Sequence, residues 1–263
     1  MVSQQIISGM KSWFGDYVKT FRSDDPEYQK NIDLKLQHTR RVCKEILDVG
    51  CSMNLNSRSL RLAEVIALFH DVGRFEQYAR YGTFSDLESE DHAQLGVKVL
   101  RKNHVLKTLD QRTADLILRT VSYHNRAKLP AEETKRCLFF TKLLRDADKL
   151  DIWRVVTDYY REMNTARNGV IELGLPDIPE ISPDVYRDMM AGRIVKTTSL
   201  KTLNDFKALQ MGWIFDVNFP KTFQLIRERG YLEKIRDVLP QTAEVAEIYL
   251  KTRSYLEAHC PTS

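Results

Sequence analysis

The sequence has little glycine, proline and cysteine, and no long run of apolar residues. It has 11 glycines and 8 prolines in 263 residues, and no segment alternates polar with apolar residues over a useful length, which argues against a β-sheet protein. The 4 cysteines are scattered without a CxxC pair, so neither a disulfide framework nor a zinc ribbon is indicated. The longest apolar stretch, Val65–Phe69, is far too short to cross a bilayer.

An excess of charge of one sign is also missing. The 40 basic and 36 acidic residues leave a formal net charge of +4, which does not favour nucleic-acid binding by bulk charge. The first residues lack a basic segment followed by an apolar one, so we do not expect a secretory signal. These absences predict a cytoplasmic protein with no membrane partner and no strong signal for nucleic acid.

Apolar residues recur instead at intervals of three and four, the spacing that places them on one face of an α-helix. Leu34, His38, Val42 and Ile46 form one such stripe, and the sequence therefore predicts an all-α protein. The expected helices cover residues 3–20, 26–52, 58–72, 89–103, 110–125, 132–164, 183–190, 199–217, 219–239 and 241–258. The least regular stretch, residues 168–183, is expected to be a packed surface loop or a lid over a pocket.

Four of the six histidines lie on the apolar faces or at the ends of expected helices. They are His38, His70, His92 and His124. Taken singly, each could be an ordinary hydrogen-bonded core residue, but four buried imidazoles together need many partners, which a shared metal ion supplies. Asp71 and Asp148 add carboxylates, and imidazole with carboxylate suits a divalent ion such as Fe, Mn or Zn.

The order of these residues, H…HD…H…H…D, resembles the HD-domain superfamily, whose members are mostly metal-dependent phosphohydrolases. Leu68–Arg74 (LFHDVGR) is similar to the defining HD turn, and Ala147–Asp151 (ADKLD) is similar to the ADxxD segment that closes the site. His92–Gly96 (HAQLG) is similar to the HPEIG segment of the HD-GYP branch. The GYP segment itself is absent after His124, so the resemblance, which covers roughly residues 30–155, does not extend to that branch.

The resemblance implies a dinuclear centre with two divalent ions, drawn from Fe, Mn, Co, Zn and Mg. The first ion would be held by His38, His70, Asp71 and Asp148, and Asp71 would bridge to a second ion held by His92 and His124. Asp146 is the alternative to Asp148, which fits the ADxxD pattern better. Asp71, Arg74 and Lys149 are the expected catalytic residues, the last two as partners of a phosphate group.

The resemblance also implies hydrolysis of a phosphoester by a metal-bridging hydroxide. The expected substrate is a small phosphorylated molecule, such as a nucleotide, and the chain could form an oligomer. The same ligand set occurs in mixed-valent di-iron oxygenases that resemble myo-inositol oxygenase, and a non-catalytic metal-stabilised binding module is a third interpretation. We expect a single domain over residues 1–263, with an HD metal-binding core at 26–160 and a helical C-terminal extension at 161–263 that could include a lid.

Overall fold

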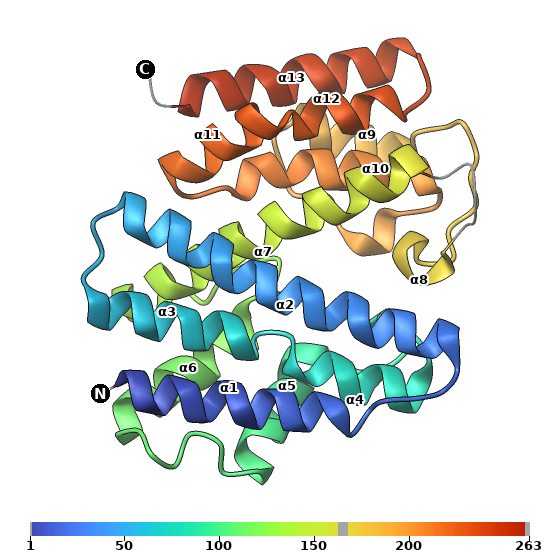
Figure 1. Ribbon diagram of the computed structural model, residues 1–263. Helices are drawn as coiled ribbons and strands as arrows, with labels where there is room; N and C mark the ends of the chain where they lie inside the picture. The colour runs from blue at the N-terminus through green and yellow to red at the C-terminus, as the bar shows by residue number, and fades with distance from the viewer. Residues whose placement is uncertain (1, 163–167, 261–263) are drawn as a thin grey trace. The chain divides into compact units, whose positions relative to one another are not determined.

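The computed structural model describes residues 2–162 and 168–260 (Figure 1). Over these ranges it consists of helices and connections without a strand, which confirms the predicted all-α class. The chain divides into two compact units, Met1–Asp148 and Lys149–Ser263. The expectations of a single domain and of a core ending at residue 160 stay predictions.

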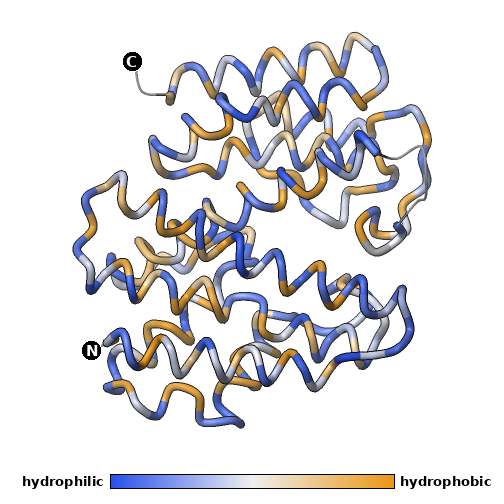
Figure 2. Tube along the Cα trace, viewed as in Figure 1, coloured by the Kyte–Doolittle hydropathy of each residue, from blue (hydrophilic) through white to orange (hydrophobic). Residues whose placement is uncertain are grey.

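The first unit contains six helices and the first half of a seventh. They are α1 (Gln4–Lys19), α2 (Pro26–Ser52), α3 (Ser57–Phe69), α4 (Val72–Tyr81), α5 (His92–Lys102), α6 (Gln111–Tyr123) and α7 (Lys135–Glu162). Helix α2 packs against α3, α4 packs against α5, and α6 contacts both α3 and α5. Figure 2 shows polar and apolar segments interleaved along these helices, the pattern of amphipathic helices around a shared core.

Local sequence signals explain where several helices begin. Asp25 caps α2 by accepting hydrogen bonds from the backbone N–H groups of Glu27 and Tyr28, and Pro26 occupies the first helical position. The predicted helix 26–52 is therefore observed with the same bounds. Asn56 and Asp110 cap α3 and α6 in the same way.

Helix α4 is a correction to the sequence prediction, which left residues 73–88 without a helix. The chain turns at His70 and Asp71 and enters α4 at once, so Gly73 lies inside a helix. A Cβ atom at Gly73 would lie 2.2 Å from the backbone oxygen of His92 and 2.5 Å from the backbone nitrogen of Gly96. Glycine is therefore required here because the backbones of α4 and α5 approach each other closely.

The second unit contains the rest of α7 and a set of shorter helices. They are α8 (Gly169–Glu172), α9 (Pro183–Met190), the 3₁₀ turn η1 (Thr197–Ser199), α10 (Leu203–Gly212), the 3₁₀ turn η2 (Trp213–Asp216), α11 (Pro220–Arg229), α12 (Tyr231–Asp237) and α13 (Ala243–His259). The predicted helix 219–239 is divided at Gly230, whose φ of 62° ends α11. None of the helices in the described ranges combines the length and apolar character needed to span a bilayer.

The irregular stretch before α9 is fixed to α10. The buried carboxylate of Asp205 accepts hydrogen bonds from the backbone N–H (2.7 Å) and hydroxyl (2.6 Å) of Ser182. The Asn204 side chain donates to the backbone oxygen of Ile178 at 2.6 Å. These bonds describe a packed loop between α8 and α9, and its use as a lid stays a prediction.

Candidate metal centre

Two helices of the first unit end in a histidine. His70 follows α3 and His124 follows α6. The Nδ1 atom of each ring lies 2.7 Å from the backbone oxygen three residues earlier, in Ala67 and Val121 respectively. Because a carbonyl oxygen can only accept, Nδ1 donates in both rings, and Nε2 is the nitrogen left to act as an acceptor or metal ligand.

His38 and Asp148 join His70 in a first group of potential ligands. The Nε2 atoms of His38 and His70 lie 3.2 Å apart. Oδ1 of Asp148 lies 3.1 Å from Nε2 of His38 and 3.6 Å from Nε2 of His70. The backbone of α7 thus brings Asp148 to the two imidazoles, and the choice of Asp148 over Asp146 as the final ligand stays a prediction.

His92 and His124 form a second group, and Asp71 lies between the two groups. His92 is the first residue of α5, and its Nε2 lies 3.0 Å from Nε2 of His124. Oδ1 of Asp71 is 3.3 Å from Nε2 of His92, whereas Oδ2 is 3.6 Å from Nε2 of His38. The two oxygens of one carboxylate therefore face different imidazole pairs, which is the arrangement that a bridging ligand requires.

His92 is oriented by Asp86, a residue that the sequence alone did not single out. Nδ1 of His92 lies 2.7 Å from Oδ2 of Asp86. Oδ1 of Asp86 also accepts hydrogen bonds from Arg74 at 3.0 Å and from Gln77 at 2.9 Å. Asp86 lies in the connection between α4 and α5, where no periodicity marks a functional position. A carboxylate behind a metal-binding imidazole fixes the ring proton on the nitrogen that faces the carboxylate, and the other nitrogen is left to bind the metal.

The two carboxylates of the cluster are ionised at neutral pH. Burial raises the pKa of Asp71, but the positive charge of Lys35 and the contacts with His70, His124 and Arg74 outweigh burial and hold this pKa well below the ordinary value. Burial also raises the pKa of Asp148, and the interactions of this carboxylate with the His38 and His70 rings more than reverse that effect. Both groups are therefore available as anionic ligands.

The His92 ring is neutral at the same pH. Burial and the nearby charge of Arg74 lower the pKa of His92 to about 4, although the hydrogen bond to Asp86 acts in the opposite direction. Metal ions bind the neutral imidazole and the ionised carboxylate, so Asp71, Asp148 and His92 are in their metal-binding protonation states near pH 7.

The second imidazole pair supplies a direct test of whether a metal ion fits. The ring proton of His92 is on Nδ1, next to Asp86, and that of His124 is on Nδ1, next to the Val121 backbone oxygen. Both Nε2 atoms are then bare acceptors that face each other at 3.0 Å. Two lone pairs at this distance repel unless a cation lies between them. The residues present therefore fit a divalent ion.

Arg74 and Lys149, the predicted phosphate-binding residues, have different surroundings in the structure. Nε of Arg74 lies 3.5 Å from Oδ1 of Asp71, while its Nη1 donates to Gln77, Asp86 and a backbone oxygen. Lys149 begins the second unit, and its ammonium lies 2.5 Å from Oδ2 of Asp216. Binding of phosphate by either residue stays a prediction.

A cation that the sequence analysis did not single out lies in the cluster itself. Nζ of Lys35 is 2.8 Å from Oδ2 of Asp71. Lys35 precedes His38 by three residues on α2, so helical spacing places both on one face. That spacing is the signal that could have found Lys35 from the sequence.

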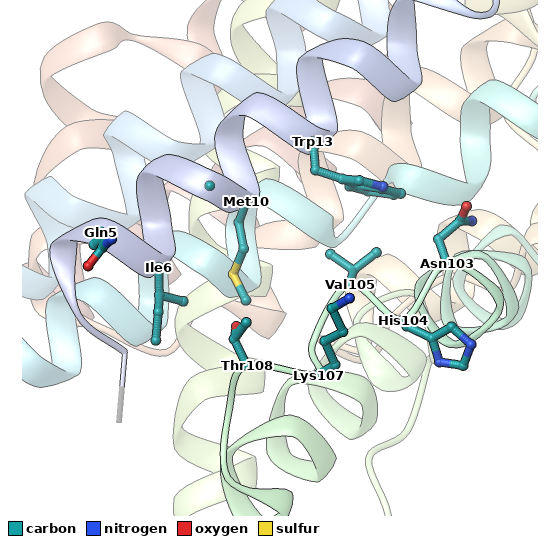
Figure 3. Close-up of a pocket in the computed structure, with 10 residues that line it drawn as sticks. Gln5, Ile6, Met10, Trp13, Asn103, His104, Val105, Lys107 and Thr108 are labelled. Atoms are coloured by element: carbon teal, nitrogen blue, oxygen red, sulfur yellow. The ribbon is translucent and has the colours of Figure 1, made fainter.

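A separate pocket of about 410 Å³ lies elsewhere in the first unit (Figure 3). Met10 and Trp13 of α1 form one side, and His104, Val105 and Thr108 of the connection after α5 form the other. Its lining includes none of the six predicted metal ligands. The chemistry expected from the sequence therefore belongs to the His/Asp cluster and not to this pocket.

Comparison with known families identifies the part of the chain that carries the cluster. Residues 36–153 match the family model of the HD domain. This range includes all six predicted ligands, from His38 to Asp148, and this part of the chain is similar to HD domains. HD domains form a family of metal-dependent phosphohydrolases. Comparisons of the chain with curated proteins and with solved structures find no match.

Proposed function

We propose that the protein is a metal-dependent phosphohydrolase that acts on a small phosphorylated molecule, such as a nucleotide, with two bound divalent ions. The observation that carries the proposal is the position of Asp71, whose two oxygens face two separate pairs of imidazole nitrogens. Membership of the HD domain in a phosphohydrolase family supports it. When bound, such ions supply an activated water and neutralise the charge of a phosphoryl group.

The charge of the ligand set also favours an anionic substrate. Four imidazoles and the carboxylates of Asp71 and Asp148 have a net charge of about −2 at neutral pH when the rings are neutral. Two divalent ions would leave the centre with a net charge of about +2, which complements a phosphomonoester dianion. The Lys35 ammonium adds a further positive charge beside Asp71. The binding affinity of a neutral polyol, by contrast, would increase little in the electrostatic field of this positive charge.

The protein contributes rigid positioning of its ligands. Backbone oxygens hold His70 and His124 through Nδ1, and Asp86 holds His92 in the same way. Three imidazoles therefore present Nε2 without needing to reorient. Lys35 and Asp148, each with a side chain about 17% exposed, connect the cluster to solvent. A site reached by solvent suits catalysis better than a closed structural metal site does.

The experiment that tests the proposal combines metal analysis with hydrolysis. Protein purified without added metal or chelator is analysed for metal content per chain, and then assayed with p-nitrophenyl phosphate and a nucleotide panel in Mn, Co or Fe. We expect two ions per chain and release of phosphate or alcohol without oxygen consumption. His92→Ala should lose one ion. His104→Asn should lose none, since His104 is an exposed residue with a φ of 51° that Asn tolerates.

Other outcomes would reject the proposal. Oxygen consumption by a protein with iron in both positions and a mixed-valent signal would identify an oxygenase. Loss of fold on chelation without any turnover would identify a metal-stabilised binding module. Two ions retained in both His92→Ala and His124→Ala would remove these residues from the centre.

A further inference from the structure

Lys35 places a cation beside the candidate metal centre. Its side chain is 17% exposed, and its Nζ lies 2.8 Å from Oδ2 of Asp71, the oxygen that also faces His38. The ammonium lies 5.2 Å from the centre of the Phe84 ring, which borders it on one side. A charged group is thus positioned between solvent and the predicted bridging ligand.

The hydrogen-bond capacity of Lys35 is only partly used. An ammonium has three donors, and in the described part of the chain one of them is used, toward Asp71. Its four-carbon stem is flexible, so the charged end can change partner without movement of the backbone. Arg74 differs because Asp86, Gln77 and the Phe84 backbone oxygen hold its guanidinium in place.

Lys35 and a metal ion also compete for the same carboxylate oxygen. Metal ions held around Asp71 would neutralise its charge and would repel the neighbouring ammonium. A lysine that serves only to neutralise Asp71 would then lose its partner once the centre is loaded. A lysine that binds substrate gains an anionic partner at the same moment.

We infer that Lys35 binds a non-bridging oxygen of the substrate's phosphoryl group at the solvent side of the metal centre. The inference rests on the proposed function and identifies the ligand as an anion of the phosphate class. Lys35 acts here as a substrate-binding residue, and its bond to Asp71 is the resting state of a side chain that changes partner when substrate arrives.

The test measures binding of inorganic phosphate to the metal-loaded protein by calorimetry, in parallel with metal content and steady-state hydrolysis. Lys35→Met removes the charge and keeps the stem, and Lys35→Arg restores a cation. Lys30→Met is the matched control, an exposed lysine on the same helix. We expect Lys35→Met to bind phosphate about 10- to 100-fold more weakly with both ions retained, because a hydrogen bond to a charged group is lost. KM should rise more than kcat falls, Lys35→Arg should recover most of the affinity, and Lys30→Met should match the parent protein.

The outcomes separate this inference from the proposed function. Phosphate affinity in Lys35→Met equal to that in Lys30→Met, with hydrolysis intact, would overturn the role of Lys35 alone. Loss of metal in both Lys35→Met and Lys35→Arg would also overturn it, since Lys35 would then support the ligand set. Absence of phosphate binding and hydrolysis in the parent protein would overturn both proposals.

Discussion

Replacing Asp86 with asparagine tests how far the second imidazole pair depends on the connection between α4 and α5. The carboxylate accepts hydrogen bonds from His92 (2.7 Å), Gln77 (2.9 Å) and Arg74 (3.0 Å). Asparagine has the same shape but offers one acceptor oxygen and one donor amide. At least one of the three donors therefore faces another donor in the variant.

The expected cost follows from these contacts. A lost hydrogen bond to a charged group costs about 1.5–3 kcal/mol. The Asp86 side chain is 30% exposed, so water compensates for part of the loss, and we expect a decrease of about 1–2 kcal/mol in the free energy of unfolding. For metal binding the effect is larger, because an altered hydrogen-bond partner behind a metal-binding histidine weakens affinity by roughly 10- to 100-fold.

The assay is metal content per chain after dialysis against graded concentrations of a chelator, with thermal unfolding measured in parallel. Asp86→Asn should release one of two ions at about 10- to 100-fold lower chelator concentration than the parent protein. Asp110→Asn is the matched control, since Asp110 is an exposed helix cap far from any predicted ligand in sequence, and asparagine caps equally well. Release of both ions at the same chelator concentration in Asp86→Asn and in the parent would refute the reasoning.

Three further predictions concern Gly73, Asp205 and the bound metal. Gly73→Ala should destabilise the protein by about 1–3 kcal/mol, because the new Cβ would lie 2.2 Å from the His92 backbone oxygen, whereas Gly9→Ala in open space on α1 should be neutral or slightly stabilising. Equal urea midpoints for these two variants would contradict the close approach of α4 and α5. Asp205→Ala should lower the free energy of unfolding by about 2–4 kcal/mol, because the backbone N–H and the hydroxyl of Ser182 both lose their acceptor. An unchanged urea midpoint would contradict this prediction. Removal of metal should lower Tm and readdition should restore it, since an ion at 100 times its Kd stabilises the folded protein by about 2.7 kcal/mol. A Tm that does not change when chelator is added would exclude bound metal.

The helices that the sequence predicted best are those with strong local signals at their ends. Asp25 and Pro26 mark the start of α2, and Ser182 and Pro183 mark the start of α9. Both helices have the predicted bounds of 26–52 and 183–190. At α2 the Asp25 cap and Pro26 act on the nearest turn of backbone, so no tertiary information is needed. At α9 the local signal is Pro183 at the first helical position, because the Ser182 hydroxyl donates to Asp205 and does not cap the helix.

The features that the sequence did not reveal depend on contacts between distant segments. Gly73 suits a position after a helix end, but the structure places it inside α4, where the backbone of α5 excludes any side chain. Asp86 lies in a connection, and its role appears only when that connection folds back against His92. The spaced ligands could be predicted because each lies at a regular position on a helix or at its end, whereas their hydrogen-bond partners have no such regularity.

The position of Lys35 bears on what the metal centre is for. If a metal site serves only to stabilise the fold, its ligands bind metal best without a competing cation. The Lys35 ammonium, 2.8 Å from Oδ2 of Asp71, is such a competitor. The His92 and His124 rings act in the opposite direction, since each has its Nδ1 bound to an acceptor and their Nε2 atoms face each other at 3.0 Å, where a cation is favoured. The cluster thus attracts cations on one side and has an ammonium that can change partner on the other. This combination suits a reaction in which an anionic substrate binds and an anionic product is released. This combination favours a phosphoryl substrate over both a neutral one and a purely structural metal site.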